Sequence, residues 1–346
     1  MLNNRFYESN ARYNFERCLQ KHSEDLTPGE VGLIRRYIVE AQATRHITDT
    51  RARKIGFTLV GWRRYIDVPF DQVTISDIYR GIANMKAGMS EKGTALKPNT
   101  QRDFIKILKP FLLWMVDENI IDLPEKKIKA IKAPTADAQT VTPEELLTPA
   151  EVGGMIDVTL SHRDRALVCT LYESGVRIGE LARLTWQDIA FDEHGARMYI
   201  NDTKTKKRRY SRLIGSAGPL QALKNSTPDL RSDSFVFLTE NGEPMAYITV
   251  VKILRRIAKR AGITKEIRPH LFRHTRITHM IQQNYQESII KQSLWGNLST
   301  QQFKTYVSLS ETDIDNEFLK RAAIRNSVEH KIKEGPGRTL ISSARP

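Results

Sequence analysis

The sequence predicts a mainly α-helical protein of two domains with one small β-hairpin. Three observations lead to this expectation: a length of 346 residues, apolar residues that recur at helical spacing along most of the chain, and a segment of small residues without periodicity near the middle. Domains typically contain about 100–200 residues, so the length fits two of them. A hydrophobic fraction of 40% is enough to fill two buried cores.

An all-helical N-terminal domain is expected over residues 24–132, after an N-terminal extension of residues 1–23 with weak periodicity. Its first helix begins after Thr27, because Thr27-Pro28-Gly29-Glu30 combines an N-cap, a proline at the first helical position and a glutamate three residues after the cap. Pro110 lies inside the apolar pattern of the last helix and should kink it. The further helices are expected at residues 48–65, 71–86 and 99–119.

A linker and a second domain follow. Residues 133–146 include a run of small residues without periodicity, which is typical of an interdomain linker. The second domain, residues 147–325, opens with Thr148-Pro149-Ala150-Glu151, the same type of helix start. Two strand-like segments, 197–200 and 210–214, predict a β-hairpin among its helices. Residues 326–346 are expected to form a flexible tail.

The composition excludes several classes of protein. The longest uninterrupted apolar stretch, residues 111–116, is far shorter than the roughly 20 residues of a membrane helix, and the first residues lack a secretory signal pattern. Cys18 and Cys169 are too few for a disulfide framework or a zinc site and suit a reducing cytoplasm. Phosphate-loop, dinucleotide and zinc-protease motifs are missing, so we expect no cofactor and no metal. The 54 Lys and Arg exceed the 40 Asp and Glu, and this net charge of +14 favours nucleic acid as a partner.

Two segments of the second domain carry charged residues that could take part in chemistry or binding. In Glu173–Leu181, a turn at Gly175 is followed by Arg177 and Glu180, which are three positions apart and share a helix face. In the predicted hairpin, six of the nine residues from 204 to 212 are Lys or Arg. Taken alone, the first pattern fits a surface ion pair, and the second fits either a solvated face or a ribbon against phosphates.

Two later segments add further residues suited to phosphate chemistry. A helix that starts at Pro269 carries His270, Arg273 and His274 within two turns. Arginine binds two phosphate oxygens at once, and histidine can transfer a proton near neutral pH. The segment from 294 to 307 contains Tyr306, which taken alone is one of eleven tyrosines.

In this order the four segments resemble the tyrosine recombinase (phage integrase) family. The family pattern has Arg in a G-x-R-x-x-E-L turn, Lys in a β-hairpin, H-x-x-R-H on a helix, and a His or Trp with a Tyr nine residues later. The resemblance covers about residues 24–325, and its first part looks like the helical, SAM-like core-binding domain of the family. The run after the tyrosine is most similar to archaeal and viral members. The matching residues are Arg177, Glu180, Lys204, His270, Arg273, His274, Asn297 and Tyr306.

The resemblance implies an enzyme that cuts and rejoins duplex DNA through a 3′-phosphotyrosyl intermediate, without metal or ATP, to integrate or excise a mobile element. Tyr306 would be the nucleophile, and Arg177 and Arg273 would stabilise the phosphate. Lys204 would protonate the leaving 5′-oxygen, with Lys206 and Lys207 as fallback candidates. His270 would act as a general acid or base for Tyr306, and His274 would support His270. Glu180 would orient Arg177.

The resemblance also implies the partners. They are duplex DNA with recombination sites and three further copies of the chain. A C-terminal helix from Ser310 would pack onto a neighbouring copy, although its apolar positions could equally pack within the same chain. No membrane and no small-molecule substrate is expected, and the place of action is the host cytoplasm or nucleoid. Most DNA contacts should bind phosphates and set register. The candidates are Arg51, Arg53, Lys54, Arg63, Arg64, Arg102, Lys106, Lys206, Lys207, Arg208 and Arg209.

One position departs from the family pattern. Asn297 stands where the family has His or Trp, and an asparagine can donate a hydrogen bond to a phosphate but cannot transfer a proton near pH 7. Trp295 is only two residues away, so a shifted register at this position also stays open. Two alternatives therefore stay open: a type IB topoisomerase, which relaxes supercoils as a monomer, and a catalytically silent DNA-binding relative. The helical N-terminal domain and the C-terminal helix favour the recombinase.

Overall fold

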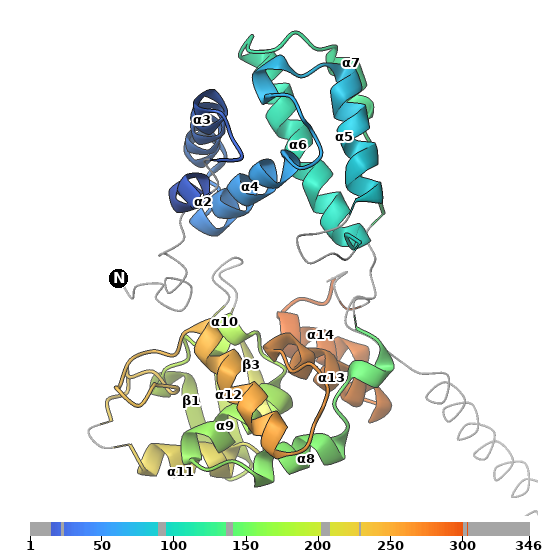
Figure 1. Cartoon of the computed structure of the whole chain (residues 1–346). Coiled ribbons are helices and arrows are strands. Elements are labelled where there is room, and N and C mark those ends of the chain that lie inside the picture. Colours follow the sequence, from blue (N-terminus) through green and yellow to red (C-terminus); the bar gives the residue numbers. More distant parts are fainter. Residues whose placement is uncertain are drawn as a thin grey trace, which may run out of the picture. The chain divides into compact units, whose positions relative to one another are not determined.

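The chain folds into two compact units, residues 1–138 and 139–346, in the computed structural model (Figure 1). The boundary falls inside the segment 133–146 for which we expected a linker. Helices dominate both units, and the described residues contain one three-stranded sheet, which confirms the predicted fold class. The structure describes residues 15–21, 24–88, 95–135, 141–201, 208–227, 230–299 and 303.

The N-terminal unit consists of helices around an apolar core. The core is rich in aromatic rings, such as Phe70 and Phe111, which pack edge to face with ring centroids 5.4 Å apart. Pro110 does not end its helix, which continues to Asp117. The elements of this unit are α2 (Phe15–Lys21), α3 (Pro28–Arg45), α4 (Asp49–Trp62), the 3-10 turn η2 (Phe70–Gln72), α5 (Ile75–Ala87), α6 (Pro98–Asp117) and α7 (Glu125–Ala130).

The start of α3 confirms the predicted capping box. The Thr27 N–H donates to the Glu30 carboxylate at 2.9 Å, and the Glu30 N–H donates to the Thr27 hydroxyl at 3.2 Å. Helix α5 starts at Ile75, four residues later than predicted, because Thr74 and Asp77 form its capping box. The residues before it form η2 instead, with Phe70 fully buried.

Helix α2 was not predicted, since residues 1–23 were expected to lie outside the helical domain. Leu19 of α2 is fully buried in the core of the unit, and Glu16 forms an ion pair with Arg35 of α3 at 2.7 Å. The helix has only seven residues and few apolar positions, so its periodicity is too short to stand out. Its packing against α4 stabilises it.

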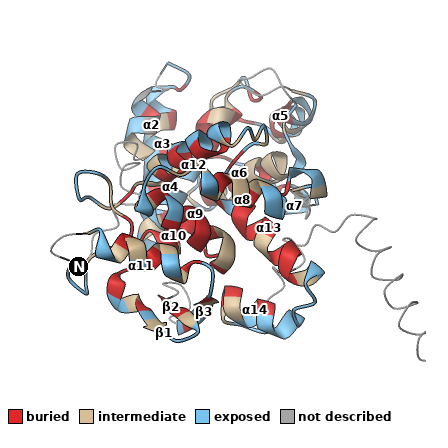
Figure 2. Ribbon diagram, turned by 90° about the horizontal axis from the view of Figure 1, so that it is seen from below, coloured by how far each residue is buried: buried red, intermediate tan, exposed pale blue. Residues whose placement is uncertain are grey.

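The second unit is also mainly helical, and Figure 2 shows that α9 and α13 are largely buried within it. Helix α8 begins with the predicted Thr148 and Glu151 capping box. None of the helices in the described part of the chain combines the length and apolar character that a membrane crossing requires. The helices and turns of this unit are η3 (Pro143–Glu145), α8 (Pro149–Asp157), α9 (His162–Ser174), α10 (Ile178–Leu181), η4 (Trp186–Asp188), α11 (Ala217–Asn225), α12 (Tyr247–Arg260), α13 (Pro269–Gln282) and α14 (Glu287–Trp295).

The sheet contains the predicted hairpin and one additional strand. Strands β2 (Gly195–Asn201) and β3 (Arg208–Leu213) pair antiparallel, and β1 (Ile189–Asp192) pairs with the other edge of β2. Side chains alternate between the two faces of a strand. On β3 the buried positions are Arg209, Ser211 and Leu213.

Candidate active site

The turn between α9 and α10 positions Arg177. Helix α9 ends at Gly175, whose φ of +56° is in the left-handed region that favours glycine. A Cβ at this position would lie 2.8 Å from Leu294 Cδ2, so a larger residue would also collide with α14. The chain then becomes extended at Arg177, the N-cap of α10. The turn therefore lies against α14 at Gly175 and leads directly into Arg177.

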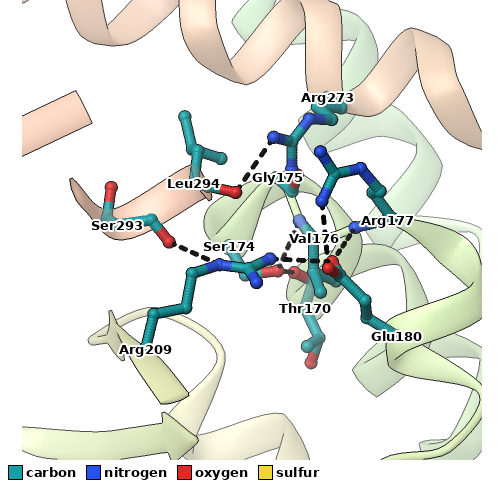
Figure 3. A network of polar contacts seen from close by, with 10 residues as sticks. All are labelled: Thr170, Ser174, Gly175, Val176, Arg177, Glu180, Arg209, Arg273, Ser293 and Leu294. Atoms are coloured by element: carbon teal, nitrogen blue, oxygen red, sulfur yellow. Dashed lines mark hydrogen bonds and ion pairs between the residues drawn. The ribbon is translucent and has the colours of Figure 1, made fainter. Parts of the chain in front are cut away.

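Glu180 connects two arginines from different elements (Figure 3). Its Oε1 lies 3.1 Å from Arg177 Nη1, and its Oε2 accepts the Arg177 backbone N–H at 2.9 Å. The same Oε2 accepts a hydrogen bond from Arg209 Nη2 of β3 at 2.8 Å. The Glu180 side chain is 7% exposed and that of Arg177 is 31% exposed. Arg177 is thus held on one side and remains partly accessible.

Arg273 lies next to Arg177 in Figure 3 and is fully buried. Its Nη1 donates to the Gly175 carbonyl at 2.7 Å, and its Nη2 donates to the Leu294 carbonyl at 3.0 Å. These carbonyls end α9 and α14, where the partial negative charge of a helix favours a cation. The guanidinium carbon also lies 4.6 Å from the centre of the Trp295 ring. Two helix ends and an aromatic ring therefore fix this cation.

The two histidines of α13 lie in different surroundings. His274 is buried, whereas His270 in the first turn of the helix is exposed. Partial desolvation of the ring and the positive charges of Arg273 and Arg177 lower the pKa of His270, while Glu180 acts in the opposite direction. At neutral pH the imidazole is therefore in the form that accepts a proton.

The lowered pKa of His270 leads to a direct prediction. In a titration of the His270 ring by NMR, we expect a pKa below the usual 6.5. Replacing Arg177 by glutamine removes a repulsive positive charge, so the pKa of His270 should rise. Replacing Glu180 by glutamine removes an attractive negative charge and should lower it further. A wild-type value at or above 6.5, or equal shifts in both variants, would contradict this electrostatic assignment.

Asn297 follows α14 and is exposed. Its Oδ1 accepts hydrogen bonds from the Ser299 N–H at 3.0 Å and the Ser299 hydroxyl at 2.9 Å. The amide nitrogen is then the group that can donate to a ligand. Asn297 can thus supply a hydrogen bond but no proton transfer.

Several predicted residues lie outside the described part of the chain. They include the segment between β2 and β3 and the segment after α14 that contains the proposed nucleophile and the predicted C-terminal helix. Cys169 is a poor alternative nucleophile, because burial raises the pKa of its thiol to about 11. No group of three or more His, Cys, Asp or Glu among the described residues could hold a metal ion. The predicted residues that lie in the two segments outside the described part of the chain are Lys204, Lys206, Lys207, Tyr306 and Ser310.

The structure corrects two of the predicted DNA contacts. The Arg209 side chain is only 2% exposed, because strand alternation turns it inward to Glu180. The Arg63 side chain is 15% exposed, and its Nε lies 3.2 Å from the buried carboxylate of Glu30. Its Nη1 also donates to the Ile66 carbonyl at 2.6 Å. Both arginines hold protein segments together and do not face solvent as DNA contacts would.

The other described candidates keep at least part of their side chains accessible. Arg102 donates to the Pro134 carbonyl at 3.0 Å, and Lys54 forms an ion pair with Asp103. Arg53 is half-buried. The Arg208 guanidinium lies over the Tyr199 ring, with its carbon 4.3 Å from the ring centre. The exposed candidates are Arg51, Lys54, Arg64, Lys106 and Arg208.

Sequence reasoning missed the role of Arg209 in the site and the contact of Trp295 with Arg273. The alternation of β3, in which Leu213 is apolar, could have indicated that Arg209 also faces inward. Trp295 could be noted from the sequence only as a neighbour of Asn297, since its position over Arg273 depends on how α14 packs against α13.

The comparisons with known proteins agree with this geometry. Residues 145–312 match the model of the phage integrase family. This segment of the chain belongs to the phage integrase family. This confirms the family that the four ordered motifs indicated. The matched segment contains all the site residues of those motifs, namely Arg177, Glu180, Lys204, His270, Arg273, His274, Asn297 and Tyr306.

Two curated relatives each match about half of this chain. Transposase A from transposon Tn554 of Staphylococcus aureus is 31% identical over 187 residues, which are 50% of this chain and 51% of that protein. The tyrosine recombinase XerD of Bifidobacterium longum is 30% identical over 192 residues, which are 52% of this chain and 62% of that protein. The chain thus spans about half the length of the first of these relatives and less than two thirds of the second.

A solved structure of lambda integrase, a tetramer bound to a Holliday junction, has the same fold. The TM-score is 0.61 with 16% sequence identity, over 80% of this chain and 76% of that one. At this identity the likeness concerns the fold.

Proposed function

We propose that this phage integrase family member is a site-specific DNA recombinase that cuts and rejoins duplex DNA for the integration or excision of a mobile element. The observation that supports this most strongly is the meeting of Arg177, Arg273 and His270 around the α9–α10 turn, with Glu180 beside them. Two fixed guanidiniums and a neutral imidazole suit the cleavage of a phosphodiester. Positioned charges of this kind usually make the largest contribution to catalysis.

The proposed reaction conserves the phosphate ester at each step. The Tyr306 oxygen attacks phosphorus, a bond from phosphorus to the tyrosine oxygen forms, and the bond to the 5′-oxygen breaks. His270 takes the tyrosine proton, and Lys204 gives a proton to the 5′-oxygen, which leaves as a hydroxyl. A 5′-hydroxyl from another duplex then attacks the phosphotyrosine and releases Tyr306. Because one ester replaces another, no ATP is needed.

Each remaining site residue has a proposed role. Arg177 and Arg273 stabilise the extra negative charge on the phosphate, and Asn297 donates a hydrogen bond to one of its oxygens. Arg273 is buried, so DNA binding has to uncover part of its guanidinium. Glu180 orients Arg177, and His274 supports His270.

The proposed partners are duplex DNA and further copies of the chain. The lambda integrase of similar fold is a tetramer on a Holliday junction, and by analogy we propose four copies around two duplexes, joined through the segment after Ser310. A protein that recombines cellular DNA would act in the cytoplasm or nucleoid. The exposed basic residues of α4 and α6 are the proposed contacts to phosphates, whose binding should weaken as salt rises.

Capture of a covalent adduct tests the proposed function. The full chain is incubated, without metal or ATP, with a pool of nicked duplexes that carry randomised sequences. Adducts that survive denaturation are recovered, their DNA is sequenced, and the attached peptide is identified by mass spectrometry. We expect a shared DNA sequence and attachment at Tyr306, and no adduct with the Tyr306→Phe variant.

A matched control and the reaction product complete this test. Tyr285, an exposed tyrosine between α13 and α14, serves as the control, and Tyr285→Phe should form the adduct as the wild type does. An adduct that persists in Tyr306→Phe would move the nucleophile elsewhere. Joining of two duplexes at the recovered sequence supports a recombinase, whereas relaxation of supercoils at any sequence would support a topoisomerase. Binding without any adduct would identify a silent DNA-binding protein.

A further inference from the structure

Arg209 makes contacts to two separate parts of the site, although it was expected to face DNA. It lies on β3, and its side chain is 2% exposed. Nη2 donates to Glu180 Oε2 at 2.8 Å, and Nε donates to the Ser293 carbonyl at 3.1 Å (Figure 3). One side chain therefore joins β3, α10 and the C-terminal end of α14.

Each of these three elements leads to a residue of the proposed reaction. Residues 202–207, which include Lys204, directly precede β3. Arg177 is the N-cap of α10 and shares Glu180 with Arg209. The chain that leaves α14 passes through Asn297 on its way to Tyr306.

We infer that Arg209 is a positioning residue of the active site, which holds Arg177 through Glu180 and holds the end of α14 through Ser293. This inference rests on the proposed recombinase function. In this role Arg209 acts through Glu180 and Ser293 and does not itself bind the phosphate.

The path of the chain after α14 supports this role. Gly296 ends α14 with a φ of +64°, and a Cβ there would lie 3.3 Å from the Arg209 Cβ. The backbone that leads to Asn297 thus passes directly against the Arg209 side chain. A change in the Arg209 side chain should move this backbone as well as Glu180.

The charge of Arg209 also matters for Glu180. Burial opposes ionisation of this carboxyl, but the hydrogen bond and charge of Arg209, followed by those of Arg177, outweigh burial and lower the pKa of Glu180. Ionised Glu180 is the form that accepts the hydrogen bonds of both arginines. Arg209 therefore keeps the Glu180 carboxyl ionised, and this carboxylate orients Arg177.

Stability alone is a poor explanation for an arginine at this position. Arg209 Nη1 is buried and makes no hydrogen bond to the described residues. Replacing a buried ion pair by apolar residues of similar volume is often neutral or stabilising. A residue kept for stability could thus be apolar, whereas a positioning role needs the directed hydrogen bonds of a guanidinium.

The test measures cleavage by Arg209→Met in single-turnover assays, with the duplex recovered in the adduct selection. Misplaced catalytic groups can cost about 100-fold in rate, so we expect the cleavage rate to fall by about 10- to 100-fold. The Kd for the same duplex should stay close to that of the wild type. Arg209→Lys keeps a charge near Glu180 and should recover part of the lost rate.

The pH profile separates positioning from a general loss of structure. Without Arg209, burial raises the pKa of Glu180, so the carboxyl becomes protonated and releases Arg177 as the pH falls. The cleavage rate of Arg209→Met should therefore drop towards acid pH more strongly than that of the wild type. This additional acid dependence should be missing in the double variant that combines Arg209→Met with Glu180→Gln. The fold-loss in cleavage rate of the double variant should be smaller than the product of the losses of the two single variants.

Arg212→Met is the matched control on the same strand. Arg212 pairs with Asp192 at 2.7 Å on the opposite face of β3, so its loss should leave the cleavage rate unchanged. A wild-type cleavage rate in Arg209→Met would overturn the inference. A double variant whose loss in rate equals the product of the losses of Arg209→Met and Glu180→Gln would also overturn it. A thermal unfolding temperature that falls in step with the rate, without recovery in Arg209→Lys, would also overturn it. If the wild type forms no adduct at all, the proposed function itself fails.

Discussion

Arg273→Gln is expected to lose both cleavage activity and stability, whereas Arg177→Gln should lose cleavage activity alone. Arg273 is fully buried and donates to the carbonyls of Gly175 and Leu294. The shorter amide of glutamine cannot reach both carbonyls, which then remain buried without a charged donor. Each unsatisfied buried group costs about 1–3 kcal/mol, so the two carbonyls together should cost about 2–6 kcal/mol in the free energy of unfolding.

Arg177 has different surroundings. Its side chain is 31% exposed, and its partner Glu180 keeps the ion pair with Arg209 when Arg177 is replaced. No buried charge is left without a partner, and stability should change little. Both arginines stabilise the same negative charge in the proposed reaction, so either variant should cleave about 10²- to 10³-fold more slowly.

Two measurements on each variant check this contrast. Urea unfolding in the absence of DNA reports stability, and single-turnover cleavage of the recovered duplex reports catalysis. Equal losses of stability in both variants would contradict the different burial of the two arginines. Full activity in Arg273→Gln would remove Arg273 from the proposed site.

The features that were predicted correctly depend on short-range chemistry. Thr27 with Glu30 and Thr148 with Glu151 lie within one helical turn, so the sequence alone specifies their capping boxes. The spacing of His270 and Arg273 on one helix is local as well. The family could be identified because four such local patterns occur in a fixed order.

The features that were missed depend on packing between distant segments. Arg209 was expected to face DNA, but Glu180 and Ser293, which bind it, lie 29 and 84 residues away. Arg63 was misassigned for the same reason, since Glu30 of another helix neutralises it. A basic residue in a charged run cannot be assigned to DNA or to an internal ion pair until its neighbours in space are known.

The buried pair of Glu30 and Arg63 leads to a second large expected effect, on the stability of the N-terminal unit. Glu30 is fully buried. Its Oε1 accepts the Phe70 N–H at 3.1 Å and lies 3.2 Å from Arg63 Nε, while its Oε2 accepts the Thr27 N–H at 2.9 Å. One carboxylate thus joins the start of α3, the residue after α4 and the start of η2.

Glu30→Leu should therefore destabilise this unit strongly. The variant leaves the Arg63 cation without its carboxylate and two backbone N–H groups without their acceptor. Removing one partner of a buried ion pair typically costs about 3–5 kcal/mol. Glu30→Gln keeps the shape and part of the hydrogen bonding, so its loss should be smaller.

Hydrogen exchange followed by mass spectrometry can locate this effect. We expect peptides from α3, α4 and η2 to lose protection in Glu30→Leu, while peptides from α9 and α13 of the other unit keep it. Glu16→Gln is the matched control, because Glu16 pairs with Arg35 near the surface and such pairs contribute only about 0–1 kcal/mol. If Glu30→Leu were as mildly affected as Glu16→Gln, the buried carboxylate would not be what joins these three segments, and Arg63 would again become a candidate for DNA contact.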